Sequence, residues 1–363
     1  VADAITGLEI DDAVEVLEGL DETARASVLE AVSGPKRAQI ERGFAYPDDS
    51  AGRLMQRTLI AVPEFWNIGR AIDYLRESDS LPDDFYELFI VDPAGRPVGT
   101  LPLDRFVRWK RSVRVGDVMD PEPHLFSAAM DQEDVAYQFQ QYDLASAGVV
   151  DEAGRLVGVI MIDDIVDVIH EEAEEDLLRL AGVSEAGLAR SVATTVRSRM
   201  SWLFVNLLTA ILASVVIFVF EGAIEEIVAA AVLMPIVASM GGNAGTQTLA
   251  VTVRAMATHS LTAANAGRIV TKEVLVGGAN GLLFAALVTL VGSLWFSYPE
   301  LGLVFGASML ITMGVAGLAG ILIPLGLGRL GMDPAVASSV FVTAVTDVVG
   351  FSSFLGLVAW LLI

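Results

Sequence analysis

Two groups of polar residues lie inside long apolar segments of this chain, and both could act on a cation. The first is the stretch 235–247, within a run that carries no charge from Ile227 to Val253. Its glycines and polar residues are Gly241, Gly242, Asn243, Gly245, Thr246 and Gln247. Together with Pro235 they predict irregular backbone, which a membrane tolerates where it is buried in protein or lines a wet cavity. We therefore predict a pore or binding site here; a kinked helix packed through small residues is the alternative.

The second group is a single carboxylate, Asp347, near the middle of the apolar segment 334–363. A carboxylate at that depth costs roughly 2.5–3.5 kcal/mol and usually marks an ion or proton path. A buried cationic partner is the alternative, but no apolar segment after residue 200 carries an interior Arg or Lys. Asn243 is also near the middle of its segment, so both signals predict an ion path at one depth.

Composition divides the chain into two unlike halves. Mean hydropathy is +0.57 and 53% of the 363 residues are hydrophobic, which is too apolar for one soluble domain. After Gly187 there are seven cations and seven acids, so the whole net charge of −23 lies before it. Such an acidic half repels nucleic acid and attracts cations, although solubility alone also explains it. The absence of cysteine excludes disulfides, thiolate metal sites and cysteine nucleophiles.

Five apolar segments after residue 200 are long enough to cross a bilayer. They are Met200–Phe220, Ile227–Val253, Val274–Pro299, Leu301–Gly328 and Pro334–Ile363. All seven cations fall on one side if the acidic half is cytoplasmic, as the positive-inside tendency requires. We expect a multi-pass protein of the plasma (inner) membrane, with its C-terminus outside.

Residues 1–50 are expected to form short amphipathic helices that are broken at Ser33, and residues 53–172 contain a repeat. Segment 89–99 matches segment 147–158, and each has a strand, a turn with Asp and Gly, a second strand and a helix. This pattern resembles a pair of cystathionine β-synthase (CBS) modules. In nucleotide-binding CBS modules, a Ser or Thr follows the turn and an Asp comes after it. In the first copy of this chain Pro102 and Arg105 occupy these two positions. In the second copy Met161 and Asp164 occupy them. The pattern therefore argues against adenosine binding.

An acidic helix is expected over residues 163–180. Asp164, Asp167, Glu171, Glu174 and Glu175 share much of one face at helical spacing. Like charges at this spacing destabilise a helix unless something neutralises them. A solvated face is one explanation. A divalent cation such as Mg²⁺, which prefers carboxylate and water oxygens, is the other.

The membrane half resembles the MgtE family of magnesium channels. The resemblance lies in Pro235-x5-Gly-Gly-Asn-x-Gly-x-Gln247, Asp333-Pro-Ala and Thr346-Asp347-x-x-Gly350, and it continues back through the CBS pair. It implies a homodimer in the lipid bilayer with an ion path on the two-fold axis, lined by Asp347, Asn243, Gln247, Thr346 and the glycines 241, 242, 245 and 350. It also implies regulatory Mg²⁺ at acidic positions. These are Asp164, Asp167, Glu172, Glu175, Asp176 and, on the N-domain side, Asp49.

The expected fold class is therefore a multidomain membrane protein. An all-α N-terminal segment (1–50), which is expected to be a partial N domain, precedes α+β tandem CBS domains (51–172, divided near 112). An acidic connecting helix (173–199) and an all-α domain of five transmembrane helices (200–363) follow. The predicted function is Mg²⁺ uptake through a channel that closes when cytosolic Mg²⁺ binds. A transporter coupled to protons or Na⁺ is the alternative. An enzyme is not expected, because Thr246 and Ser239 have no His or Lys nearby.

Overall fold

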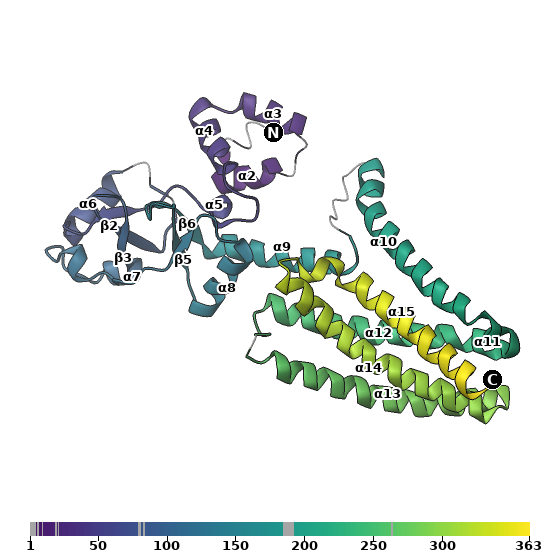
Figure 1. Cartoon of the computed structure of the whole chain (residues 1–363). Coiled ribbons are helices and arrows are strands. Elements are labelled where there is room, and N and C mark those ends of the chain that lie inside the picture. Colours follow the sequence, from purple (N-terminus) through teal and green to yellow (C-terminus); the bar gives the residue numbers. More distant parts are fainter. Residues whose placement is uncertain are drawn as a thin grey trace. The chain divides into compact units, whose positions relative to one another are not determined.

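The computed structural model describes residues 5, 7, 8, 10–18, 20, 22–78, 81, 82, 84–183, 192–262 and 264–363. The chain forms two compact units, Val1–Glu172 and Ala173–Ile363. The first contains helices and two small sheets, and the second is helical throughout its described part (Figure 1). This confirms the predicted fold class.

The N-terminal helices form a small core of their own. They are α2 (Ile10–Glu18), α3 (Glu22–Ala31) and α4 (Gly34–Gly43). Ser33 stands at the N-cap of α4 with a proline in its first turn, so the predicted break separates two helices. Val14, Leu17 and Ile40 are buried between them.

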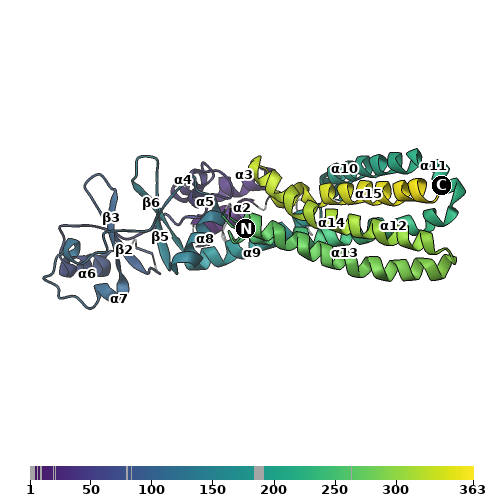
Figure 2. The ribbon, with the colours of Figure 1, turned by 60° about the horizontal axis from the view of Figure 1, so that its bottom comes forward.

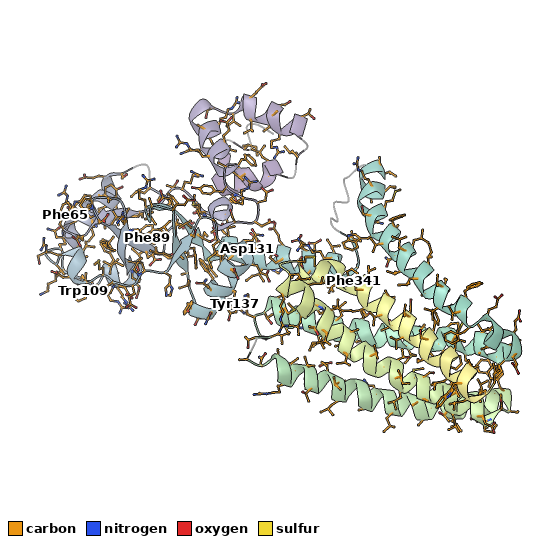
Figure 3. The ribbon with its side chains drawn as sticks, viewed as in Figure 1. Phe65, Phe89, Trp109, Asp131, Tyr137 and Phe341 are labelled. Atoms are coloured by element: carbon orange, nitrogen blue, oxygen red, sulfur yellow. The ribbon has the colours of Figure 1, made fainter. Side chains whose placement is uncertain are left out.

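The predicted repeat forms two sheets of identical topology. The first copy contains β1 (Ala61–Pro63), α6 (Ile68–Glu77), β2 (Glu87–Val91), β3 (Pro97–Pro102) and α7 (Leu103–Phe106). The second contains η1 (Val115–Asp117), β4 (Leu125–Ser127), α8 (Gln132–Tyr142), β5 (Ser146–Val150), β6 (Leu156–Met161) and α9 (Ile162–Leu180). In each sheet the central strand pairs parallel with the first strand and antiparallel with the third. Phe89 lies on the central strand of the first sheet, and Asp131 caps α8 (Figure 3).

The repeated Asp-x-x-Gly-Arg turn has a hydrogen-bonding reason. Asp92 accepts hydrogen bonds from the backbone N–H groups of Ala94 and Arg96, and Asp151 does the same in the second copy. The glycine of each turn adopts a left-handed conformation, with φ of +78° at Gly95 and +74° at Gly154. The hydrogen bonds from Arg155, backbone first, lower the pKa of the Asp151 carboxyl.

The two copies are interleaved rather than separate. Gln56, which precedes the first copy, forms a bridge with Val159 in the sheet of the second. Asp120, which precedes β4, forms the matching bridge with Thr100 of the first sheet. Each sheet is thus completed by the segment that leads into the other copy, so neither copy is structurally independent.

A buried carboxyl group lies between the two copies. Glu87 of β2 accepts a hydrogen bond of 2.9 Å from the hydroxyl of Ser146 on β5. Burial raises the pKa of Glu87, and nearby Asp120 acts in the same direction. The hydrogen bonds from Ser146 and Thr100 oppose this rise but do not cancel it.

We predict that Glu87 causes the free energy of unfolding of the first unit to decrease as pH rises. Because its pKa is higher in the folded state, protonated Glu87 contributes stability at low pH that is lost as pH rises through the folded pKa. Glu87→Gln removes this contribution to the pH dependence. Urea unfolding of the full chain, followed by fluorescence at mildly acidic and neutral pH, checks the change. The exposed control Glu152→Gln is expected to retain the wild-type dependence, and an unchanged slope in Glu87→Gln would contradict the prediction.

The second unit contains the five predicted membrane-length helices. Its helices are α10 (Val192–Val219), α11 (Glu221–Glu226), α12 (Val228–Ala257), α13 (Ala266–Phe296), α14 (Pro299–Arg329) and α15 (Pro334–Leu361). Among the candidate spans α14 has the largest buried share, since it packs against α12, α13 and α15. Figure 2 shows these helices running side by side along the unit.

Two helices differ from the predicted pattern. Helix α12 is continuous from Val228 to Ala257 although Pro235 and three glycines lie within it. The expectation of irregular backbone in this stretch is therefore wrong. Helix α9 confirms the acidic helix expected over residues 163–180, but it runs without a break across the predicted domain boundary at 172/173. Of the predicted connecting helix, residues 184–191 lie outside the described part, and Val192 onwards belongs to α10.

Candidate ion path and candidate cation sensor

The glycines of α12 and α15 let the helices approach closely. A Cβ at Gly245 would lie 2.6 Å from Cγ1 of Val342, and one at Gly241 would overlap the methyl group of Thr312. Gly350 of α15 similarly faces the backbone of Ala238, at 3.4 Å. These glycines are buried packing positions, as is typical where membrane helices approach through small residues.

Polar side chains of α12 lie on its exposed faces. Asn243, Thr246 and Gln247 are all exposed, and Gly242 is half-buried. Asn243 and Gln247 line a groove of about 510 Å³ between α12, α13 and α14. Within the described chain neither carboxamide makes a hydrogen bond, whereas Thr246 donates to the Gly242 carbonyl at 2.9 Å. The two carboxamides are thus available to water or to another molecule.

Asp347 is half-buried on α15, directly after Thr346, whose side chain is buried against α12. No described residue forms an ion pair or hydrogen bond with the Asp347 carboxylate. Asp347 lies outside the groove that contains Asn243 and Gln247, and its carboxylate has no partner among the described residues.

The end of α9 is attached to the helices that carry these residues. Arg179 forms ion pairs with Glu175 and with Asp333. Asp333 also caps α15, since it accepts a 2.7 Å hydrogen bond from the Ala335 N–H. Leu180 packs on a small buried cluster contributed by α12 and α15, namely Leu249, Val253, Ala335 and Val342. Sequence reasoning missed this attachment, although Arg179 is the only cation in the acidic run 163–180.

A carboxylate-lined pocket of about 140 Å³ lies in the first unit. Its ionisable lining residues are Asp12, Asp49, Arg53, Asp164, Asp167 and Glu171. They come from α2, the 46–52 linker, α5 (Ala51–Leu54) and α9. Asp49, Asp164 and Asp167 were predicted as metal positions, and the structure brings them together. Asp12 was not predicted, because only the tertiary fold places α2 beside α9.

Several of the predicted metal positions also have structural roles. Asp164 accepts hydrogen bonds from the Met161 N–H and the Gln56 side chain, at 3.2 and 3.4 Å. Glu172 accepts a 2.8 Å hydrogen bond from Gln132 but does not line the pocket. Asp49 has a left-handed backbone, with φ of +55°. Glu175 and Asp176 lie further along α9, in the second unit.

The pocket suits a hydrated cation better than a directly ligated one. Among the described residues no three carboxylates lie close enough together to hold a metal ion. The volume of 140 Å³ holds several waters, since each requires roughly 10–15 Å³. Mg²⁺ gives up water reluctantly and is often held by one or two carboxylates. The lining of five acids and one guanidinium fits such an ion.

The cleft around Glu87 and Ser146 is almost closed, with a volume of about 10 Å³. Phe89, Met161 and Val159 occupy its walls. The expectation drawn from Pro102 and Met161 stays a prediction.

The fold defines a multi-span membrane protein with a tandem CBS unit. The family model described as MgtE, a divalent cation transporter, matches residues 234–357, and the CBS-domain model matches residues 115–171. The chain belongs to the MgtE family, because it is 33% identical over 360 residues to the magnesium transporter MgtE of Thermus thermophilus.

That match covers 97% of this chain and 80% of the relative. The magnesium transporter MgtE of Bacillus subtilis is 28% identical, with 98% and 79% covered. A solved cytosolic domain of the Mg²⁺ channel MgtE in complex with ATP is 30% identical, with a TM-score of 0.44. It covers 46% of this chain and 68% of that one.

We predict that the glycines of α12 differ in their tolerance of a methyl group. Gly245→Ala forces Val342 to move and is expected to cost about 1–3 kcal/mol, the usual cost of overpacking. In Gly242→Ala the new methyl lies 3.9 Å from the Thr346 hydroxyl, so no loss is expected. Thermal unfolding of the purified full chain in one detergent compares the two. Equal stability of both variants would contradict the packing role assigned to Gly245.

Proposed function

We propose that this protein is a Mg²⁺ channel whose pore forms between two copies of the chain and is closed by cytosolic Mg²⁺. The observation that carries the proposal is the Asp347 carboxylate, which has no partner in the described part of the chain and lies within an apolar, membrane-length helix. Similarity to magnesium transporters supports Mg²⁺ as the cargo. The family is one of transporters, and the proposal includes no chemistry on a substrate.

Asp347 requires a counter-charge or water at its depth. A carboxylate in hydrocarbon is costly, and the single chain offers it no cation or donor among its described residues. Two copies of Asp347 across a shared axis would attract a dication and keep the path wet. Because Mg²⁺ holds its water tightly, two carboxylates could pass it in hydrated form without a cage of direct ligands.

The exposed polar face of α12 supports a homodimer. Asn243, Thr246 and Gln247 are exposed in the single chain, although they lie on a membrane-length helix. The Asn243 and Gln247 carboxamides line the groove between α12, α13 and α14 without a hydrogen bond to any described residue, so a water-filled path or a second subunit is the favourable environment. In this proposal the pore residues are Asp347, Asn243, Gln247, Thr346 and Gly242, and the glycines 241, 245 and 350 set the helix separation.

The carboxylate-lined pocket of the first unit is proposed as the Mg²⁺ sensor. Bound Mg²⁺ reduces repulsion between Asp49, on the linker, and Asp164 and Asp167, on α9. It therefore stabilises the arrangement in which these elements lie together. The ion shifts the gating equilibrium only because it binds this arrangement more tightly than the open one. Glu172, Glu175 and Asp176 extend the proposed sensor along α9.

Attachment of α9 to the pore helices supports the coupling. Arg179 links α9 to the residue that caps α15, and Leu180 packs against both α12 and α15. A shift of α9 therefore acts directly on the two helices that carry Asp347 and Asn243.

Orientation follows from the cations of the second half. With the first unit in the cytoplasm, Arg254, Arg268, Lys272 and Arg329 all lie on the cytoplasmic side, as the positive-inside tendency requires. The C-terminus then lies outside, and uptake proceeds across the plasma (inner) membrane.

A carrier coupled to protons or Na⁺ is the second candidate. A single intramembrane carboxylate is also what a coupling site requires, so Asp347 alone is compatible with it. Mg²⁺ flux into liposomes without any proton or Na⁺ gradient separates the two, since a channel conducts under a Mg²⁺ gradient alone.

We predict that Asp347→Asn reduces Mg²⁺ flux into liposomes by at least about tenfold. This corresponds to losing roughly 1.4 kcal/mol of ion stabilisation in the path. The matched control Asp333→Asn removes an acid outside the proposed pore and is expected to retain flux, with altered closure. Flux of Asp347→Asn equal to wild type would remove the pore assignment.

We also predict that Mg²⁺ protects the first unit from limited proteolysis. In the double variant Asp49→Asn with Asp167→Asn, the Mg²⁺ concentration needed for protection is expected to rise several-fold. Removing two charges weakens cation attraction in the pocket. Asp163→Asn lies on α9 outside the pocket and serves as the control. A cleavage pattern that never responds to millimolar Mg²⁺, or an equal effect of the control, would contradict the sensor.

A further inference from the structure

A shallow hollow lies on the surface of α13, near its first turns. It has a volume of about 550 Å³. Its lining residues are Arg268, Thr271, Lys272, Leu275, Val276 and Ala279. All six belong to α13, which packs against α14 on its other side. Lys272 and Val276 also line the groove between α12, α13 and α14, so the hollow lies beside that groove, with its two cations toward the N-terminal end of α13 and its aliphatic groups further along the helix.

The charge at this end of the hollow is unbalanced. Arg268 and Lys272 are four residues apart, so they are neighbours on one face of the helix. Both are exposed, and neither pairs with an acid among the described residues. The adjacent Glu273 instead accepts a 3.5 Å hydrogen bond from Thr248 of α12, inside the other groove. The N-terminal end of the α13 dipole adds to the positive potential.

The depth of the two cations matches a lipid headgroup. At about 1.5 Å per residue, Lys272 lies roughly 35 Å along α13 from Trp295, an exposed aromatic of the kind found at membrane interfaces. The hydrocarbon core is about 30 Å thick, so Lys272 and Arg268 fall at the opposite interface. Leu275 and Val276, both exposed, then lie just inside the hydrocarbon.

We propose that this hollow binds an anionic phospholipid. Its phosphodiester lies between the Arg268 guanidinium and the Lys272 ammonium, and an acyl chain follows Leu275 and Ala279. Charge complementarity selects the occupant, because the hollow carries two cations and no acid, and its remaining surface is almost entirely apolar. The inference requires only that α13 spans the membrane, and it holds whether or not Asp347 conducts Mg²⁺.

The test uses the full chain in phosphatidylcholine bilayers with a small fraction of spin-labelled lipid. Electron paramagnetic resonance measures the lipid immobilised by the protein, for labelled phosphatidylglycerol against labelled phosphatidylcholine. Wild type is expected to prefer phosphatidylglycerol. Arg268→Gln with Lys272→Gln is expected to reduce that preference by up to about fivefold for each cation removed. The charge-matched control, Arg254→Gln with Arg329→Gln, removes two exposed cations outside the hollow and is expected to keep it.

Four outcomes would overturn the inference. The first three are an unchanged preference in the double variant, an equal loss in the control, and exclusion of both labelled lipids from α13, which would indicate a second copy of the chain on this face. Inorganic phosphate that reduces the preference more than chloride of equal ionic strength would also overturn it, because it would indicate a free-anion site. Thermal unfolding of each variant verifies that folding is retained, and no transport measurement enters the test.

Discussion

The architecture of the membrane unit depends on how a charged group is kept in apolar surroundings. Asp347 lies on a helix whose other described residues are almost all apolar or small, and none of the described residues neutralises it. Such a group is tolerated only with water, a cation or another subunit beside it. The glycines at 241, 245 and 350 affect this carboxylate indirectly, because they allow close helix packing around α12 and α15, and Asp347 is part of α15.

The first unit also contains carboxylates that need a counter-charge, but there they line a pocket rather than lie within apolar surroundings. Five carboxylates line one pocket with a single guanidinium, so its closure is opposed by repulsion that a cation relieves. No three of the described acids are close enough to ligate one ion directly. This separation favours a cation that keeps its water.

Helix α9 carries residues of the acidic pocket and also contacts the membrane-length helices. Helix α9 carries Asp164 and Asp167 near its beginning and Arg179 near its end. Arg179 pairs with the cap of α15, and Leu180 packs against α12 and α15. In the proposed coupling, α9 is the element that carries both the sensor residues and Arg179.

Much of this organisation was determined by the sequence alone, because its causes are local or periodic. Apolar runs of bilayer length predicted the five spans, because hydropathy is read directly from consecutive residues. The recurring Asp-x-x-Gly-Arg turn predicted the two repeats, because its hydrogen bonds join residues only a few positions apart. Only the tertiary structure decided that Gly241 and Gly245 are packing positions within a continuous helix. Only it brought Asp12 into the acidic pocket, paired Arg179 with Asp333 and interleaved the two repeats. Those features join residues far apart in the chain, and local pattern carries no information about which distant surfaces meet.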